Sequence, residues 1–316
     1  MNILNDGVHG PEADLSAPLS APPPPPPVEK LRALLHSIAF SAVAILFVYL
    51  IFGMVLTLKG PFDHRLLPIM AYGLAITALL LESWLFLTLG DEKEFNSLGL
   101  TFHPGWSTEL LAGAGTGLAL MAGVCGILAA THLARYSGLA RYPHRVAAPL
   151  FATATFILLA AALEEVAFRG YAFQRLIDAT GALGAVAIFS LLFGLVHYTN
   201  PSATVLSTAN TVLAGIVMAL GYLRTRALWF PIGLHFAWNF FLGPIASFPV
   251  SGIHLGFTMF EVHVQGPFWL TGGDYGPEGS IILTAVCLLA VAWLARKPEL
   301  LLPAARETPY DRDSGS

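Results

Sequence analysis

The chain has 316 residues, of which 55% are hydrophobic and only 11% are charged. A soluble domain carries about 25% charged residues, so this composition excludes an ordinary soluble fold and indicates a surface that mostly faces lipid. The net charge of −4 leaves no basic footprint, so we expect no nucleic-acid partner. The two cysteines, Cys125 and Cys287, lie in separate apolar runs, which argues against a disulfide framework or a cysteine-based metal site.

The two ends of the chain differ from its middle. Residues 1–30 are rich in Pro, Ala and Ser and include six consecutive prolines, Pro22 to Pro27. Such a run favours a stiff, solvated polyproline segment, so we expect a disordered N-terminal tail. Residues 298–316 are polar, and a second flexible tail is expected there. The transmembrane domain should therefore occupy residues 31–297.

Hydrophobic segments follow one another between these tails. A helix needs about 20 residues to cross the hydrocarbon core of a bilayer. The candidates run near residues 33–58, 67–89, 109–131, 147–163, 182–198, 203–223, 228–246 and 280–296. The fourth and fifth are short and flank a polar motif, which predicts one long or broken helix there; irregular backbone is tolerated at membrane depth only where it lines a cavity. The fold class predicted is all-α, a polytopic membrane protein with about eight transmembrane helices.

The connections between the segments predict an orientation. With eight spans both termini share one side, and nine Lys or Arg residues near span ends fall on that side against five on the other. Cytoplasmic loops carry the excess of basic residues, so both termini are predicted to be cytoplasmic. The longest connection, residues 247–279, is rich in Gly, Pro and aromatic residues and contains no Lys or Arg.

Three polar motifs interrupt the hydrophobic segments. They are EEVAFRG with Glu164, Glu165 and Arg169, FGLVH ending in His197, and HFAWN with His235 and Asn239. Ionisable groups at membrane depth are costly unless paired or hydrated, so each is a candidate for a functional site. Three such motifs on neighbouring apolar segments predict one buried polar chamber, which we interpret as a hydrolytic active site.

Helical geometry divides the roles of the two glutamates. Glu165 and Arg169 are four residues apart, so they share a helix face and are expected to form an internal ion pair that braces the helix. Glu164 is rotated by about 100° from Glu165 and should face the chamber. A carboxylate in a water-poor pocket is suited to act as a general base and then as a general acid. His235 and Asn239 also share a face, and with His197 they offer groups that orient water and donate to an oxyanion.

Glu82 is a further carboxyl group, alone in the second predicted span. It could belong to the chamber, but a solitary hydrogen-bonded or proton-relay role is the interpretation that we favour. The oligomeric state is left open by the sequence.

The three motifs together resemble the CAAX protease and bacteriocin-processing (CPBP, Abi) family of intramembrane endopeptidases, also called the type II CAAX prenyl endopeptidase family. The family pattern is a double Glu followed by Arg, then Phe-x-x-x-His, then His-x-x-x-Asn, and the resemblance covers roughly residues 145–245. It implies an eight-helix membrane fold and a glutamate-based endopeptidase. In that scheme Glu164 and His197 activate a water, His235 and Asn239 stabilise the oxyanion, and Glu165 and Arg169 support the site. No resident metal or cofactor is implied.

The resemblance also bears on the substrate. Eukaryotic members cleave the last three residues from prenylated CAAX proteins, whereas relatives in bacteria are associated with bacteriocin immunity or peptide maturation. We therefore expect cleavage of a peptide or a membrane-associated protein, with a multi-pass location in a bacterial inner (plasma) membrane. The N-terminal extension and the connection 247–279 are not explained by the family pattern.

Other functions remain as alternatives. The sequence has no H-E-x-x-H motif, no G-x-S-x-G turn and no aspartate pair within the spans. A zinc site built from Glu164, His197 and His235 is chemically feasible and would make the protein a metalloendopeptidase. A non-catalytic scaffold or a bacteriocin-immunity factor would use the same residues only to bind a partner. A transporter ranks last, because no internal repeat of the kind common in transporters is evident.

Overall fold

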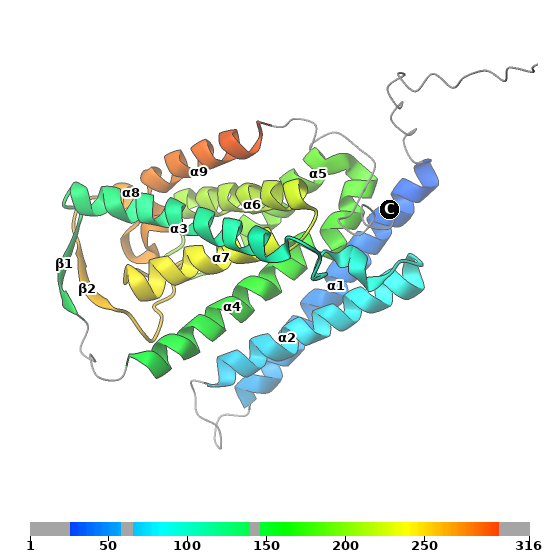
Figure 1. The fold of residues 1–316 in the computed structure, drawn as a ribbon, viewed down its shortest axis with the longest axis horizontal. Coiled ribbons are helices and arrows are strands. Elements are labelled where there is room, and N and C mark those ends of the chain that lie inside the picture. The colour runs from blue at the N-terminus through cyan, green and yellow to red at the C-terminus, as the bar shows by residue number, and fades with distance from the viewer. Residues whose placement is uncertain (1–25, 58–65, 140–145, 297–316) are drawn as a thin grey trace, which may run out of the picture.

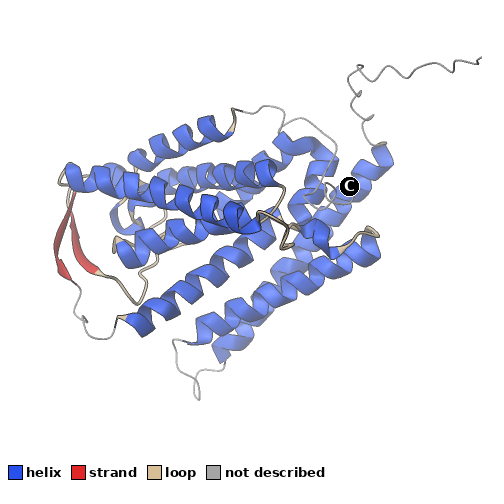
Figure 2. Ribbon diagram, viewed as in Figure 1, coloured by secondary structure: helices blue, strands red, loops and turns tan. Residues whose placement is uncertain are grey.

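The computed structural model describes residues 26–57, 66–139 and 146–296. These residues form a bundle of α-helices, with one small β-ribbon at its edge (Figures 1 and 2). In chain order the elements are α1 (Pro27–Thr57), α2 (Leu66–Leu85), α3 (Trp106–Ala130), β1 (Ala134–Leu139), α4 (Ala147–Arg169), α5 (Tyr171–His197), α6 (Val205–Thr225), α7 (Trp229–Phe240), β2 (Phe260–Val264), α8 (Phe268–Thr271) and α9 (Ile281–Leu294). The prediction of an all-α membrane fold is confirmed by this architecture.

Helix lengths separate the candidate membrane spans from the shorter helices. Within the described residues, five helical segments are long and apolar enough to cross a membrane, and α4 with α5 counts as one of them, at 51 residues. Helix α9 has 14 residues and α7 has 12, fewer than a perpendicular crossing requires. Each of the eight predicted segments overlaps a helix, and the number of crossings stays a prediction.

The outer surface of the bundle carries large apolar side chains. Ile45, Leu111, Phe151 and Leu289 are each at least 70% exposed. Large apolar side chains this exposed on α1, α3, α4 and α9 are unusual in a soluble protein, which rarely leaves extensive apolar surface in water. This surface is suited to lipid, which agrees with an integral membrane protein.

The predicted break in the chain around the first polar motif is present. Helix α4 ends at Arg169, Gly170 leaves the helical conformation with ψ −139°, and α5 begins at Tyr171. A second departure lies at Gly181, where φ is +81°, a value that glycine adopts without strain. The kinks separate α4, which carries the two glutamates, from the second half of α5, which carries His197.

The N-terminal boundary differs from the predicted one. Helix α1 begins at Pro27, inside the predicted tail of residues 1–30. Proline is favoured in the first turn of a helix, because its missing N–H has no intrahelical partner there and its φ is already helical. Glu29 lies in the same turn, where a negative charge interacts favourably with the helix dipole. Residues 1–25 and the predicted tail 298–316 lie outside the described residues.

Two connections that the sequence left without secondary structure pair with each other. Strand β1, between α3 and α4, is antiparallel to β2, with Ala134 opposite Val264 and Leu139 opposite Phe260. An irregularity in the register lies between Tyr136 and Gly138. The ribbon joins the connection 247–279 to the end of α3 (Figure 2).

Helices α3 and α7 lie in direct backbone contact. A Cβ atom added at Gly113 would lie 2.0 Å from the carbonyl oxygen of Phe230, and one at Gly117 would lie 2.2 Å from that of Leu234. From the other side, a Cβ at Gly233 would lie 2.1 Å from the carbonyl oxygen of Leu110. Small residues allow helix backbones to approach this closely in membranes. The contact fixes α7, which carries the third polar motif.

We expect Gly117→Ala to destabilise the protein by about 1–3 kcal/mol, because the added methyl group has no space against α7. Gly115→Ala on the same helix is the matched control, since no atom lies within 4 Å of its added Cβ. Thermal unfolding of both variants in detergent micelles measures the effect. Equal unfolding midpoints for the two variants would contradict the backbone contact between α3 and α7.

Candidate active site

The three polar motifs meet at one point inside the bundle. The carboxylate oxygen Oε2 of Glu164 lies 3.7 Å from Nε2 of His197 and 3.9 Å from Nε2 of His235. These side chains come from α4, the end of α5 and α7, so three separate helices supply them. The structure brings together the residues that the sequence grouped into a chamber.

A cavity of about 920 Å³ surrounds this point. Its lining includes Glu164, His197, His235 and Asn239. Helix α1 contributes mostly apolar side chains, among them Phe40, Ile45, Val48 and Phe52. The segments after α5 contribute polar ones: Thr199, Asn200, Asn210, Thr211, Ser251 and Glu278. The cavity is thus suited to a ligand with both an apolar and a polar part.

The tautomer of His197 follows from its hydrogen bond. Its Nδ1 lies 2.7 Å from the carbonyl oxygen of Phe193, which can only accept, so Nδ1 carries the hydrogen. In the neutral ring the lone pair is then on Nε2, the nitrogen that faces Glu164. Both groups that face each other here are therefore proton acceptors.

His235 is held by the second glutamate. Its Nδ1 lies 2.8 Å from Oε1 of Glu165, and the same oxygen accepts a hydrogen bond from Nη1 of Arg169 at 3.2 Å. Glu165 is 0% exposed and His235 is 5% exposed. The ion pair expected from the i,i+4 spacing is present, but Glu165 also orients His235, a contact that the spacing did not predict.

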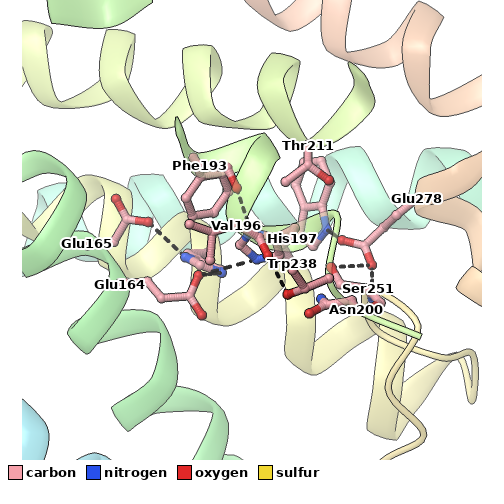
Figure 3. Close-up of polar contacts among 12 residues, drawn as sticks. Glu164, Glu165, Phe193, Val196, His197, Asn200, Thr211, Trp238, Ser251 and Glu278 are labelled. Carbon is pink, nitrogen blue, oxygen red and sulfur yellow. Dashed lines mark hydrogen bonds and ion pairs between the residues drawn. The ribbon is translucent and has the colours of Figure 1, made fainter. Parts of the chain in front are cut away.

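Arg169 ties the motif to two further helices. Its Nη2 donates to the carbonyl oxygen of Gly215 on α6 at 2.9 Å, and its guanidinium carbon lies 4.7 Å from the centre of the Phe193 ring on α5. The side chain is buried, with 1% exposed. An arginine in this position neutralises Glu165 and leaves the neighbouring Glu164 facing the cavity (Figure 3).

Glu82 does not share this site. It is 3% exposed, and within the described part of the chain neither of its carboxylate oxygens has a hydrogen-bond partner. The cavity around Glu164 is not lined by it. The solitary hydrogen-bonded or proton-relay role expected for Glu82 therefore stays a prediction.

One acidic residue of the cavity was missed by the sequence reasoning. Glu278 lies at the end of the connection 247–279, is 8% exposed and accepts hydrogen bonds from Trp238 and Ser251 (Figure 3). It stands shortly before the last apolar helix, and its connection contains no Lys or Arg to pair with it. An unpaired acid next to an apolar helix was the one available signal.

Comparison with known families agrees with the motifs. Residues 146–241 match the family model described as type II CAAX prenyl endopeptidase, Rce1-like. This stretch of the chain, called the Rce1-like region below, is similar to that family. The resemblance to the CAAX protease family is thereby confirmed there, and all six predicted site residues fall within it. No curated protein and no solved structure matches the chain at a significant level. The Rce1-like match ends before the connection 247–279 that also lines the cavity.

We expect Arg169→Ala to reduce the folded yield and to lower the thermal midpoint, because the buried Glu165 loses its guanidinium partner and keeps only the hydrogen bond from His235. Breaking a buried pair in this way costs about 3–5 kcal/mol. Size-exclusion chromatography and thermal unfolding in detergent measure both effects. Arg135→Ala, at an exposed position on β1, serves as the control, and a parent-like midpoint for Arg169→Ala would contradict the bracing role.

Proposed function

We propose that this protein is an intramembrane endopeptidase that hydrolyses a peptide bond of a membrane-associated protein or peptide. The observation that carries the proposal is the approach of one carboxylate and two imidazole nitrogens from three helices within one cavity inside the bundle. The Rce1-like match supports peptidase activity within the membrane. We also propose a bacterial inner membrane as its location, with both termini in the cytoplasm.

The first chemical step uses Glu164 and His197. The distance of 3.7 Å between Glu164 Oε2 and His197 Nε2 is too long for a good direct hydrogen bond and suits a bridging water. Both groups accept, so together they orient the two protons of that water. Glu164 removes one proton, and the resulting hydroxide attacks the carbonyl carbon of the scissile bond.

The second step uses the groups on α7. Attack forms a tetrahedral intermediate whose oxygen carries negative charge, and hydrogen-bond donors aimed at that oxygen lower the barrier. Asn239 and Nε2 of His235 are the proposed donors. His235 can donate only when both ring nitrogens are protonated, and the Glu165 carboxylate at Nδ1 supplies the counter-charge. Glu164 then returns its proton to the leaving amine as the carbon–nitrogen bond breaks.

Zinc-dependent hydrolysis by the same residues is the second candidate. Nδ1 of each histidine is already hydrogen-bonded to an oxygen, which is also typical of histidines that bind metals through Nε2. Against it, the described part of the chain contains no group of three or more His, Cys, Asp and Glu side chains placed to hold a metal ion. We therefore propose a metal-free mechanism.

Glu164→Ala should lower the rate of peptide-bond cleavage at least about 100-fold, because the general base is removed. The variant should still insert into the membrane and fold. The measurement compares the membrane peptidomes of cells that carry the parent protein and cells that carry this variant. Intact proteins or peptides that accumulate only with the variant are the substrate candidates. Glu261→Ala, at an exposed position on β2, is the control.

The same comparison separates an enzyme from a scaffold or immunity factor. If a partner-binding role were correct, Glu164→Ala would leave the biological effect intact and the two peptidomes would be identical. That outcome would remove the proposed general base.

Treatment of the purified protein with a strong chelator should leave its peptidase activity unchanged, with less than one equivalent of bound metal by elemental analysis. The physical reason is that Glu164 and His197 activate the water without a Lewis acid. Loss of activity with the chelator, followed by recovery when Zn²⁺ alone is added back, would establish the zinc mechanism instead.

A further inference from the structure

The connection 247–279 contributes to the cavity although it lies outside the Rce1-like match. Val250, Ser251, Ile253 and Leu255 line the cavity together with Glu278. The connection is also tightly folded. A Cβ at Gly252 would lie 2.0 Å from the carbonyl oxygen of Pro201, and one at Gly276 would lie 2.3 Å from that of Pro249. This part of the chain is therefore packed against the end of the site rather than extended from it.

The Glu278 side chain joins α7 to this connection. Its Oε1 accepts a hydrogen bond from the indole Nε1–H of Trp238 at 2.9 Å. Its Oε2 accepts from the backbone N–H of Ser251 and, at 3.1 Å, from the Ser251 hydroxyl. Trp238 is 2% exposed and precedes Asn239 on α7. One carboxylate thus holds the turn of α7 on which the proposed oxyanion donors lie.

The surrounding backbone is held at two further points. The buried Asn210 side chain on α6 donates to the carbonyl oxygens of Glu278 and Ser280, at 2.8 Å each. Asn200 lies three residues after His197 and donates to the carbonyl oxygen of Ser251 at 3.0 Å. Glu278 is therefore fixed relative to α6 and to the end of α5, and its hold on Trp238 places α7 relative to His197.

Three donors saturate most of the acceptor capacity of this carboxyl group. Burial raises the pKa of the Glu278 carboxyl, and the hydrogen bonds from Ser251 and Trp238 oppose that rise. A buried polar group that has this many partners defines a single arrangement of the elements it joins. A glutamine has nearly the same shape, but its amide nitrogen can only donate. It would therefore lose the bond to Trp238 or the bonds to Ser251.

We propose that Glu278 is a positioning residue for the active site, which acts through Trp238 to hold His235 and Asn239 in place for hydrolysis. This inference rests on the proposed peptidase function. It extends the working site beyond residues 146–241 and gives the connection 247–279 a role in catalysis rather than only in folding.

The test is a kinetic double-mutant cycle with Glu278→Gln, Trp238→Phe and the double variant, all in lipid nanodiscs. Two probes are used. One is a fluorogenic farnesylated peptide that ends in a CAAX sequence, and the other is a library of peptides from the membrane fraction of the cells that express the protein. We expect Glu278→Gln to lower kcat by about 10- to 100-fold with KM within about 3-fold, because small displacements of catalytic groups have effects of this size. Trp238→Phe should lower kcat similarly, and the double variant should be no slower than the worse single variant.

Glu261→Gln is the matched control, because it changes an exposed carboxylate on β2 of the same connection and should keep the parent kcat. If Glu278→Gln does not fold, Trp238→Phe carries the test. It removes the indole N–H together with part of a buried ring, so thermal unfolding of this variant must show that it keeps the parent fold. A folded Glu278→Gln or Trp238→Phe with the parent kcat would overturn the inference, and so would additive effects in the cycle. Failure of the proposed function is a different result: the parent cleaves neither probe, or Glu164→Gln remains active.

Discussion

A single carboxylate oxygen, Oε1 of Glu165, joins the parts of this site. It accepts from Arg169 on its own helix and from Nδ1 of His235 on α7. Arg169 extends the network to Gly215 on α6 and to the Phe193 ring on α5. A charge buried this completely is tolerated only when it is paired, so the four helices must keep their relative positions for the ion pair to exist. Glu164 faces the cavity, because it is Glu165 that makes the contacts with Arg169 and His235.

Much of this arrangement could be predicted from the sequence, because the rules that govern it are local. Polar side chains on apolar helices are costly unless they are paired or hydrated. This rule predicted that the motifs of Glu164, His197 and His235 would lie together. The i,i+4 spacing predicted the ion pair between Glu165 and Arg169. The bond from His235 to Glu165 could not be predicted, because it depends on how α7 lies against α4. That placement is set partly by the backbone contact with α3 at Gly113 and Gly117. Their spacing of four residues indicates that another helix approaches closely, but does not say which helix.

The connection 247–279 was beyond sequence reasoning for a different reason. Apart from the short alternation at Phe260–Val264 it has no helical or strand periodicity, and its conformation depends on glycines with positive φ, such as Gly252 and Gly276. Its strand β2 forms only by pairing with β1, more than 100 residues earlier in the chain. The partners of Glu278 likewise come from α6, α7 and Ser251, so neither its burial nor its contacts follow from its neighbours in sequence.

Helix α7 is held both by the Rce1-like region and by the connection 247–279. It has 12 residues, so its length alone does not fix its position in a bilayer. Two glutamates hold it instead: Glu165 binds His235, and Glu278 binds Trp238 three residues later, with the two carboxylates on opposite sides of the site in Figure 3. Because both bonds end on buried side chains, a shift of α7 toward either glutamate would break the bond to the other. The positions of His235 and Asn239 on this short helix thus depend on one glutamate inside the Rce1-like region and one outside it.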